Sequence, residues 1–122
     1  MNAEYTTALE LSADQSKPIF KTVFHHANDA IFIVDIENDA IVDCNPAAES
    51  LVGHSRDELL SMAASKLHPH NFSKFQTFAE RVVSEGSGWT DDITCYNADG
   101  EIVPANMSAS VVELDGRPHI IN

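Results

Sequence analysis

The sequence predicts an α+β domain, in which a five-stranded antiparallel sheet carries helices on one face and an amphipathic helix comes first. The order of patterns predicts this class: two strand-like segments within residues 30–44 precede several helical segments, and three strand-like segments follow residue 88. The run at residues 101–114 also alternates apolar and polar side chains, as a strand with one buried face does. With 122 residues the chain fits a single domain.

The N-terminal region predicts a short amphipathic helix. Residues 1–15 are interpreted as a linker or an extension of that helix, and residues 16–122 as the domain, truncated in its last strand. Ser16 can cap the helix, and Pro18 is tolerated in its first turn. An apolar stripe follows at Ile19, Phe20, Val23, Phe24 and Ala27. Leaving a large apolar side chain in water costs about 1.5–3 kcal/mol, so the chain's own sheet or a partner subunit must cover this stripe.

The next segment predicts a β-hairpin followed by a capped helix. Residues 30–36 and 40–44 are rich in β-branched residues and are separated by a turn. Asn45 can cap the helix that follows, with Pro46 at its first position and Gly53 at its end.

Two further helices are predicted before the second group of strands. Ser55, with Glu58 three residues later, matches the capping box that opens a short helix. Residues 71–85 have apolar side chains at helical spacing and form the longest predicted helix, which ends at the Gly-Ser-Gly of residues 86–88.

The remaining sequence predicts three strands. The first covers residues 89–96, and a turn with Gly100 at a positive φ leads to the second, at residues 101–114. A turn at residues 115–116 then leads into the fifth strand of the sheet, at residues 117–122.

The chain is strongly acidic, with 19 Asp and Glu against 7 Lys and Arg and a formal net charge of −12. Such a surface repels nucleic-acid phosphates and anionic membranes, so neither is expected as a partner. A halophilic source accounts for the charge, because acidic surfaces keep proteins soluble in high salt, and an ordinary acidic cytosolic protein is the alternative. The sequence shows neither a signal peptide nor an 18-residue apolar run, which predicts a cytoplasmic location without membrane contact by this fragment.

Three segments, with the helix at residues 71–85, match the pattern of a known family. DAIFIVD followed by IVDCNPAAESLVGHSRDELL (within residues 29–60) is similar to a first hairpin, an Asn-Pro-Ala helix start and a Gly-x-Ser-x-x-Glu-Leu-Leu stretch. NADGEIVPANMSASVV (residues 97–112) is similar to an Asp-Gly turn and the strand after it. From Ile19 to Asn122 the chain therefore resembles the PAS family of sensor domains.

The resemblance implies a cavity between the inner face of the sheet and the helices. It also implies a signalling role in a protein such as a histidine kinase or a transducer, with a covalently linked output domain beyond residue 122. A homodimer through the N-terminal helix and the outer face of the sheet is expected. The sequence contains no visible nucleophile–base pair, paired-carboxylate motif or phosphate loop, so an enzyme is not expected.

The resemblance also bears on cofactors, of which none is identified. Aligned with haem-binding PAS domains, the iron-ligating histidine falls at Phe75, whose ring cannot ligate iron. Covalent flavin chemistry needs a cysteine that the segment from Asn45 to Ile93 lacks. His68 and His70 form an H-x-H pair, but beside a proline they are expected to face solvent and to hold no metal. A small aromatic or apolar ligand fits the resemblance better than haem or a covalent flavin.

The inner face of the predicted sheet is the candidate ligand site. In the family's geometry, the face of the predicted strand that carries alternate residues from 89 to 95 looks into the cavity. The predicted lining is Val42, Cys44, Leu51, Met62, Leu67, Phe72, Phe75, Trp89, Asp91, Ile93, Cys95 and Met107. The two cysteines lack a metal-binding spacing and are interpreted as small buried residues. A disulfide between them is the alternative.

Asp91 stands out in this set, because a carboxylate among apolar neighbours needs a hydrogen-bond donor or a proton. It is a candidate to accept a hydrogen bond from the ligand, with Asn106 and Ser108 as weaker candidates. The alternative is that Asp91 lies at an exposed end of its strand, beside Asp92, and is solvated.

The sequence thus predicts a sensor domain that binds a small, flat, mostly apolar ligand in its core and relays the signal to an output domain. A ligand-free module for dimerisation or protein interaction is the alternative. Small residues expected to point inward, beside large ones, leave room for a cavity and favour the ligand. The small ones are Ala105, Ala109, Cys44 and Cys95, and the large ones are Phe75 and Trp89.

Overall fold

The computed structural model describes residues 13–69, 71–103 and 105–121, except the side chains of residues 13–18. Five strands form one antiparallel sheet in the order β2-β1-β7-β6-β3, which confirms the predicted sheet. These strands are β1 (Phe32–Asp35), β2 (Ala40–Cys44), β3 (Ser87–Thr90), β6 (Met107–Leu114) and β7 (Arg117–Ile121). Two short strands, β4 (Cys95–Tyr96) and β5 (Ile102–Val103), form a separate antiparallel pair.

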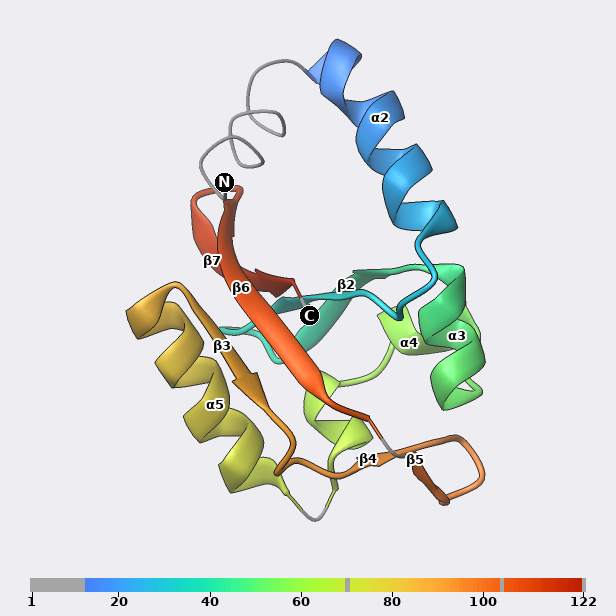
Figure 1. The fold of residues 1–122 in the computed structure, drawn as a ribbon, viewed down its shortest axis with the longest axis vertical. Coiled ribbons are helices and arrows are strands. Elements are labelled where there is room, and N and C mark those ends of the chain that lie inside the picture. The colour runs from blue at the N-terminus through green and yellow to red at the C-terminus, as the bar shows by residue number, and fades with distance from the viewer. Residues whose placement is uncertain (1–12, 70, 104, 122) are drawn as a thin grey trace.

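Except for α2, the described helices lie beside this sheet (Figure 1). The described helices are α2 (Ala13–His26), α3 (Pro46–Val52), α4 (Arg56–Leu60), the 3-10 helix η1 (Ala64–Leu67) and α5 (Phe72–Glu85). Helix α5 runs beside β3, and α4 packs against β2. Helix α2 projects away from the sheet, so it leaves much of its surface uncovered by the rest of the domain.

The core lies between the inner face of the sheet and the helices. Its buried members include Val34, Ile41, Val52, Leu59, Phe75, Phe78, Val82 and Ile120. Gly88 lets α5 approach β3 closely, because a Cβ at this position would lie 3.1 Å from Val82 Cγ2 and 3.3 Å from Phe78 Cε1. Both distances are shorter than an optimal carbon–carbon contact, so this strand position needs a glycine for α5 to sit where it does.

The predicted caps of α3 and α4 are confirmed. The Asn45 side chain accepts a hydrogen bond from the Ala48 backbone N, and Pro46 occupies the first turn of α3. Gly53 ends α3 with a left-handed φ of 72°. Ser55 opens α4 with the predicted capping box. Local sequence alone therefore defines the start of each of these helices.

The prediction of one strand at residues 89–96 is wrong. The chain leaves β3 after Thr90, bends, and re-enters a strand only at β4. In the bend, the Thr94 backbone N donates to Asn71 Oδ1 and the Thr94 carbonyl contacts His68 Nδ1. Two side chains from the start of α5 and the loop before it thus take the hydrogen bonds that a sheet neighbour would have supplied.

The prediction of one strand at residues 101–114 is also wrong. The first part is β5, which pairs with β4 outside the main sheet, and the second part is β6. Pro104 lies between them and is outside the described residues. Gly100 has the predicted positive φ, at 80°, and the turn before β7 has positive φ at Asp115 and Gly116.

Residues 13–15 belong to α2, as the alternative of a helix extension expects. Ser16 and Pro18 lie inside α2, so the predicted cap at Ser16 and the predicted first-turn position of Pro18 are wrong. Residues 1–12 of the predicted linker or extension lie outside the described residues. Phe24 is buried, whereas Ile19 and Val23 are 68% and 62% exposed. The rest of the described domain therefore covers only part of the apolar stripe.

A buried polar cluster that was not predicted joins β1 to β7 on the face opposite the core. The Asp35 carboxylate accepts hydrogen bonds from the Asn38 backbone N and from Asn38 Nδ2, and it lies 2.9 Å from Arg117 Nη2. His119 is buried beside it, 4.0 Å away. The Asn38 side-chain hydrogen bond is the main cause that holds the pKa of Asp35 below its ordinary value, so this carboxylate stays charged at neutral pH.

Candidate ligand cavity

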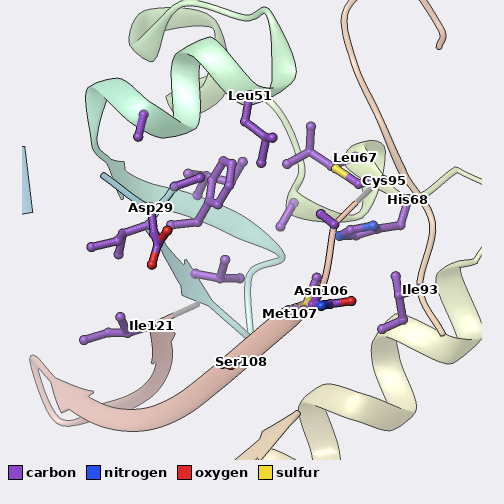
Figure 2. Close-up of a pocket in the computed structure, with 18 of the residues that line it drawn as sticks. Asp29, Leu51, Leu67, His68, Ile93, Cys95, Asn106, Met107, Ser108 and Ile121 are labelled. Atoms are coloured by element: carbon purple, nitrogen blue, oxygen red, sulfur yellow. The ribbon is translucent and has the colours of Figure 1, made fainter. Parts of the chain in front are cut away.

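A cavity of about 1050 Å³ lies between the helices and the inner face of the sheet (Figure 2). Its walls come from α3, η1, α5, the hairpin β1–β2, the bend after β3 and the start of β6. The apolar part of the lining includes Val34, Ile41, Leu51, Ala64, Leu67, Phe75, Ile93 and Met107. A volume near the top of the range for small-molecule sites, with mostly apolar walls, is what a small organic ligand requires.

Polar side chains are few in this lining. Asn28, Asp29, Ser50, Asn106 and Ser108 are exposed, so they border the mouth of the cavity. Among the described polar residues of the lining, His68 is the one whose side chain is buried.

His68 follows η1, and its buried position contradicts the prediction that it faces solvent. Its relative exposure is 4%. The ring stacks on Phe75, with 4.8 Å between the ring centroids. The Nδ1 atom of His68 lies 3.0 Å from the Thr94 carbonyl oxygen. His70, the other histidine of the pair, is outside the described residues.

Burial determines the charge state of this ring. Desolvation lowers the pKa of His68 from its ordinary value of 6.5, against smaller opposing effects of the Thr94 hydrogen bond and of Asp39. The imidazole is therefore neutral at pH 7. Because a carbonyl oxygen only accepts hydrogen bonds, Nδ1 must carry the proton of the neutral ring.

Several predicted site residues do line the cavity. They are Leu51, Leu67, Phe75, Ile93, Cys95 and Met107. Asn106 and Ser108, which were weaker candidates for hydrogen bonding to a ligand, also border it. These residues come from four separate parts of the chain, and Figure 2 shows Leu51, His68 and Asn106 arranged around one space.

The other predicted site residues lie outside the lining. Trp89 is 55% exposed on β3, and Asp91 is exposed in the bend that follows, so the solvated alternative describes Asp91. Phe72 is 51% exposed at the start of α5. Met62 packs against the core away from the cavity, and Cys44 is buried beside a separate hollow near the end of α2.

A β-bulge explains the position of Val42. Val34 pairs with Ile41 while Ile33 pairs with Asp43, so Val42 is the extra residue of β2. The bulge shifts the alternation of β2. As a result Ile41 and Cys44 are both buried, whereas Val42 is 41% exposed.

The segment before β1 also lines the cavity, although none of its residues was predicted to do so. Its lining residues run from Ala27 to Ile31. Asn45 holds this segment in place, because its side chain bonds the Asp29 carbonyl and the Ile31 backbone N. The predicted cap at Asn45 was the available signal, but a cap alone does not reveal bonds to residues 14–21 positions earlier.

Chemically, the cavity is suited to binding. Cys95, in the lining, is a free thiol, and burial raises its pKa. Cys44, outside the lining, is also a free thiol, and burial raises its pKa to about 11. Protonated thiols are poor nucleophiles and poor metal ligands. Within the described ranges, no three His, Cys, Asp or Glu side chains gather in a way that could hold a metal ion. The described helices also include none that is both long and apolar enough to cross a membrane.

Comparisons with known proteins show which family this fold resembles. The family model for the PAS domain matches residues 28–121. A curated relative, the methyl sulfide methyltransferase-associated sensor of Methanosarcina acetivorans, is 24% identical over 110 residues, which make up 88% of this chain and 11% of that protein. The chain thus spans about a tenth of the length of this relative.

Solved structures share the fold. The PAS domain of a two-component sensor histidine kinase superposes with a TM-score of 0.76 at 18% identity, covering 90% of this chain and 95% of that one. A domain of a sensory box sensor histidine kinase/response regulator from Geobacter sulfurreducens gives 0.69 at 24% identity, covering 90% and 94%. These likenesses agree with the observed sheet order. The match of the family model over residues 28–121 establishes that the chain belongs to the PAS domain family.

Proposed function

We propose that this PAS domain is the sensing module of a larger signalling protein and that its cavity binds a small, flat, mostly apolar ligand. The cavity carries the proposal: about 1050 Å³ with a mostly apolar lining is more space than the side chains around it fill. Binding, rather than catalysis, is the role that the protonated thiol of Cys95 and the neutral imidazole of His68 support.

The signal would pass from the cavity through the elements that line it. Phe75 belongs to α5, Met107 and Ser108 begin β6, and Ile121 ends β7. A ligand that binds one arrangement of these elements more tightly than another shifts the population toward it. The much greater length of the curated relative supports a covalently linked output domain as the receiver of this change.

Homodimerisation through α2 and the outer face of the sheet is part of the proposal. Ile19 and Val23 lie on α2 and are mostly exposed, and a second copy of the chain would cover them. A domain that dimerises without any ligand is the alternative function. The cytoplasmic location and the halophilic source remain predictions from the composition.

A titration with indene tests the ligand proposal. Indene is a flat bicyclic hydrocarbon without a hydrogen-bond donor, and we expect it to bind at one saturable site with a Kd on the order of tens of micromolar. In ¹H–¹⁵N correlation spectra of the whole chain, amide shifts should concentrate at Ile93, Cys95 and Met107, whereas Trp89 and Ile102 serve as internal controls. Shifts that never saturate, or that spread equally over both groups, would favour the ligand-free module.

A further inference from the structure

His68 has one ring nitrogen engaged and one free to take part in binding. Nδ1 is held by the Thr94 carbonyl, and no other described residue forms a hydrogen bond with Nε2. The ring lies in the lining of the cavity and is 96% shielded from solvent, given its exposure of 4%. Figure 2 shows it projecting from its loop toward the space enclosed by Leu51 and Asn106.

The orientation of the ring is fixed from two sides. Phe75 stacks against its face, and the Thr94 carbonyl fixes its rotation about the side-chain axis. Thr94 is itself held, because its backbone N donates to Asn71 Oδ1. Such preorganisation reduces the entropy that a binding partner of Nε2 would have to offset.

The chemistry of Nε2 is equally restricted. With the proton on Nδ1, Nε2 has only a lone pair and can accept a hydrogen bond but not donate one. Asp39 is the charged group that acts on this ring, and its effect does not outweigh the desolvation that keeps the ring neutral. A buried acceptor without a partner is unfavourable, and buried polar atoms in proteins are paired in the great majority of cases.

We infer that the ligand of this cavity carries a hydrogen-bond donor, a hydroxyl or an N–H group, on its otherwise apolar frame, and that His68 Nε2 accepts this hydrogen bond. The inference rests on the proposed function and adds the polar group that a ligand must have. His68 thereby determines specificity, because an isosteric ligand without the donor leaves Nε2 unpaired. Asn106 and Ser108 contribute less, since both are exposed and can bond water instead.

The test compares indole with indene, which have the same shape and differ by an N–H in place of a methylene group. Their Kd values are measured for the whole chain and for His68→Phe, which keeps an aromatic ring against Phe75 and removes both nitrogens. The preference for indole is the Kd of indene divided by that of indole. We expect His68→Phe to lower this preference about tenfold and to leave the Kd of indene within about twofold. The different cost of transferring the two probes from water cancels in this comparison.

Two further variants keep the test informative. His68→Gln keeps a side-chain acceptor and should retain part of the indole preference. This variant provides a test of the inference if His68→Phe fails to fold. His26→Phe alters an exposed histidine outside the cavity and should retain all of it. An unchanged preference in both His68 variants, with indene still bound, would overturn the inference and leave His68 as a structural partner of Thr94. Failure of both indene and indole to bind the unaltered chain would instead overturn the proposed function, whereas binding of indole alone would support the inference.

Discussion

Asn45→Ala is expected to lower the free energy of unfolding by about 3–5 kcal/mol, the largest loss that we predict for one side chain of this domain. Asn45 is fully buried. Its Oδ1 accepts from the backbone N of Ile31 at 2.9 Å and of Ala48 at 3.0 Å. Its Nδ2 donates to the backbone carbonyls of Phe24 at 3.0 Å and Asp29 at 2.9 Å.

The size of this loss follows from what the alanine leaves behind. Four backbone groups lose the same partner at once, and buried groups without partners cost more than the hydrogen bonds themselves contributed. The same bonds tie the end of α2 and the segment before β1 to the start of α3. Loss of Asn45 should therefore also loosen one wall of the cavity.

Urea denaturation followed by circular dichroism measures the effect, with Ser55→Ala as the matched control. Ser55 also caps a helix, but its capping bonds are exposed, so its loss should cost only about 1 kcal/mol. Asn45→Asp retains an acceptor for Ile31 and Ala48 but turns a carboxylate oxygen toward the two carbonyl oxygens, so a loss at least as large as that of Asn45→Ala is expected. Equal losses for Asn45→Ala and Ser55→Ala would contradict the role given to Asn45.

Leu51→Trp is expected to weaken indene binding by about tenfold or more. Leu51 lies on α3, lines the cavity and is 37% exposed, so a bicyclic side chain can enter the cavity from its mouth. An indole ring in that position takes the volume that indene would occupy. Because the position is partly exposed, the free energy of unfolding should change by less than about 1 kcal/mol.

Ile102→Trp is the matched control for this variant. Ile102 is 63% exposed on β5 and lies outside the cavity lining. It places the same side chain on the surface and should leave the Kd of indene unchanged. If both tryptophan variants weaken binding equally, or neither does, the ligand does not occupy this cavity.

The parts of the fold that depend on neighbouring residues could be predicted from the sequence. The cap at Asn45, the capping box at Ser55 and Glu58, and the positive φ at Gly100 each follow from residues within one turn. The sheet was also predictable, because apolar and turn-forming residues alternate in an order that an antiparallel sheet satisfies.

The parts that depend on distant residues were not predictable. The bend at Thr94 forms because Asn71 and His68 bond its backbone from 23 and 26 residues away. Val42 is exposed because a bulge, set by the pairing of two strands, adds one residue to β2.

His68 was misjudged because only tertiary packing reveals that its ring rests on Phe75. Leu51 and Phe75 were identified correctly because helical periodicity places them on an inward face. Ile93 lines the cavity although it lies in the bend and not in the predicted strand. The segment at residues 27–31 was missed because long-range hydrogen bonds from Asn45 hold it there.

Native mass spectrometry of the freshly purified chain, compared with its mass after denaturation, tests the central claim most directly. A ligand held in the cavity predicts an additional mass in the native spectrum that is lost on denaturation. That mass should also be displaced by indole. A native mass equal to that of the chain alone, combined with no saturable binding of indene or indole, would contradict the claim and leave a PAS domain that acts through dimerisation.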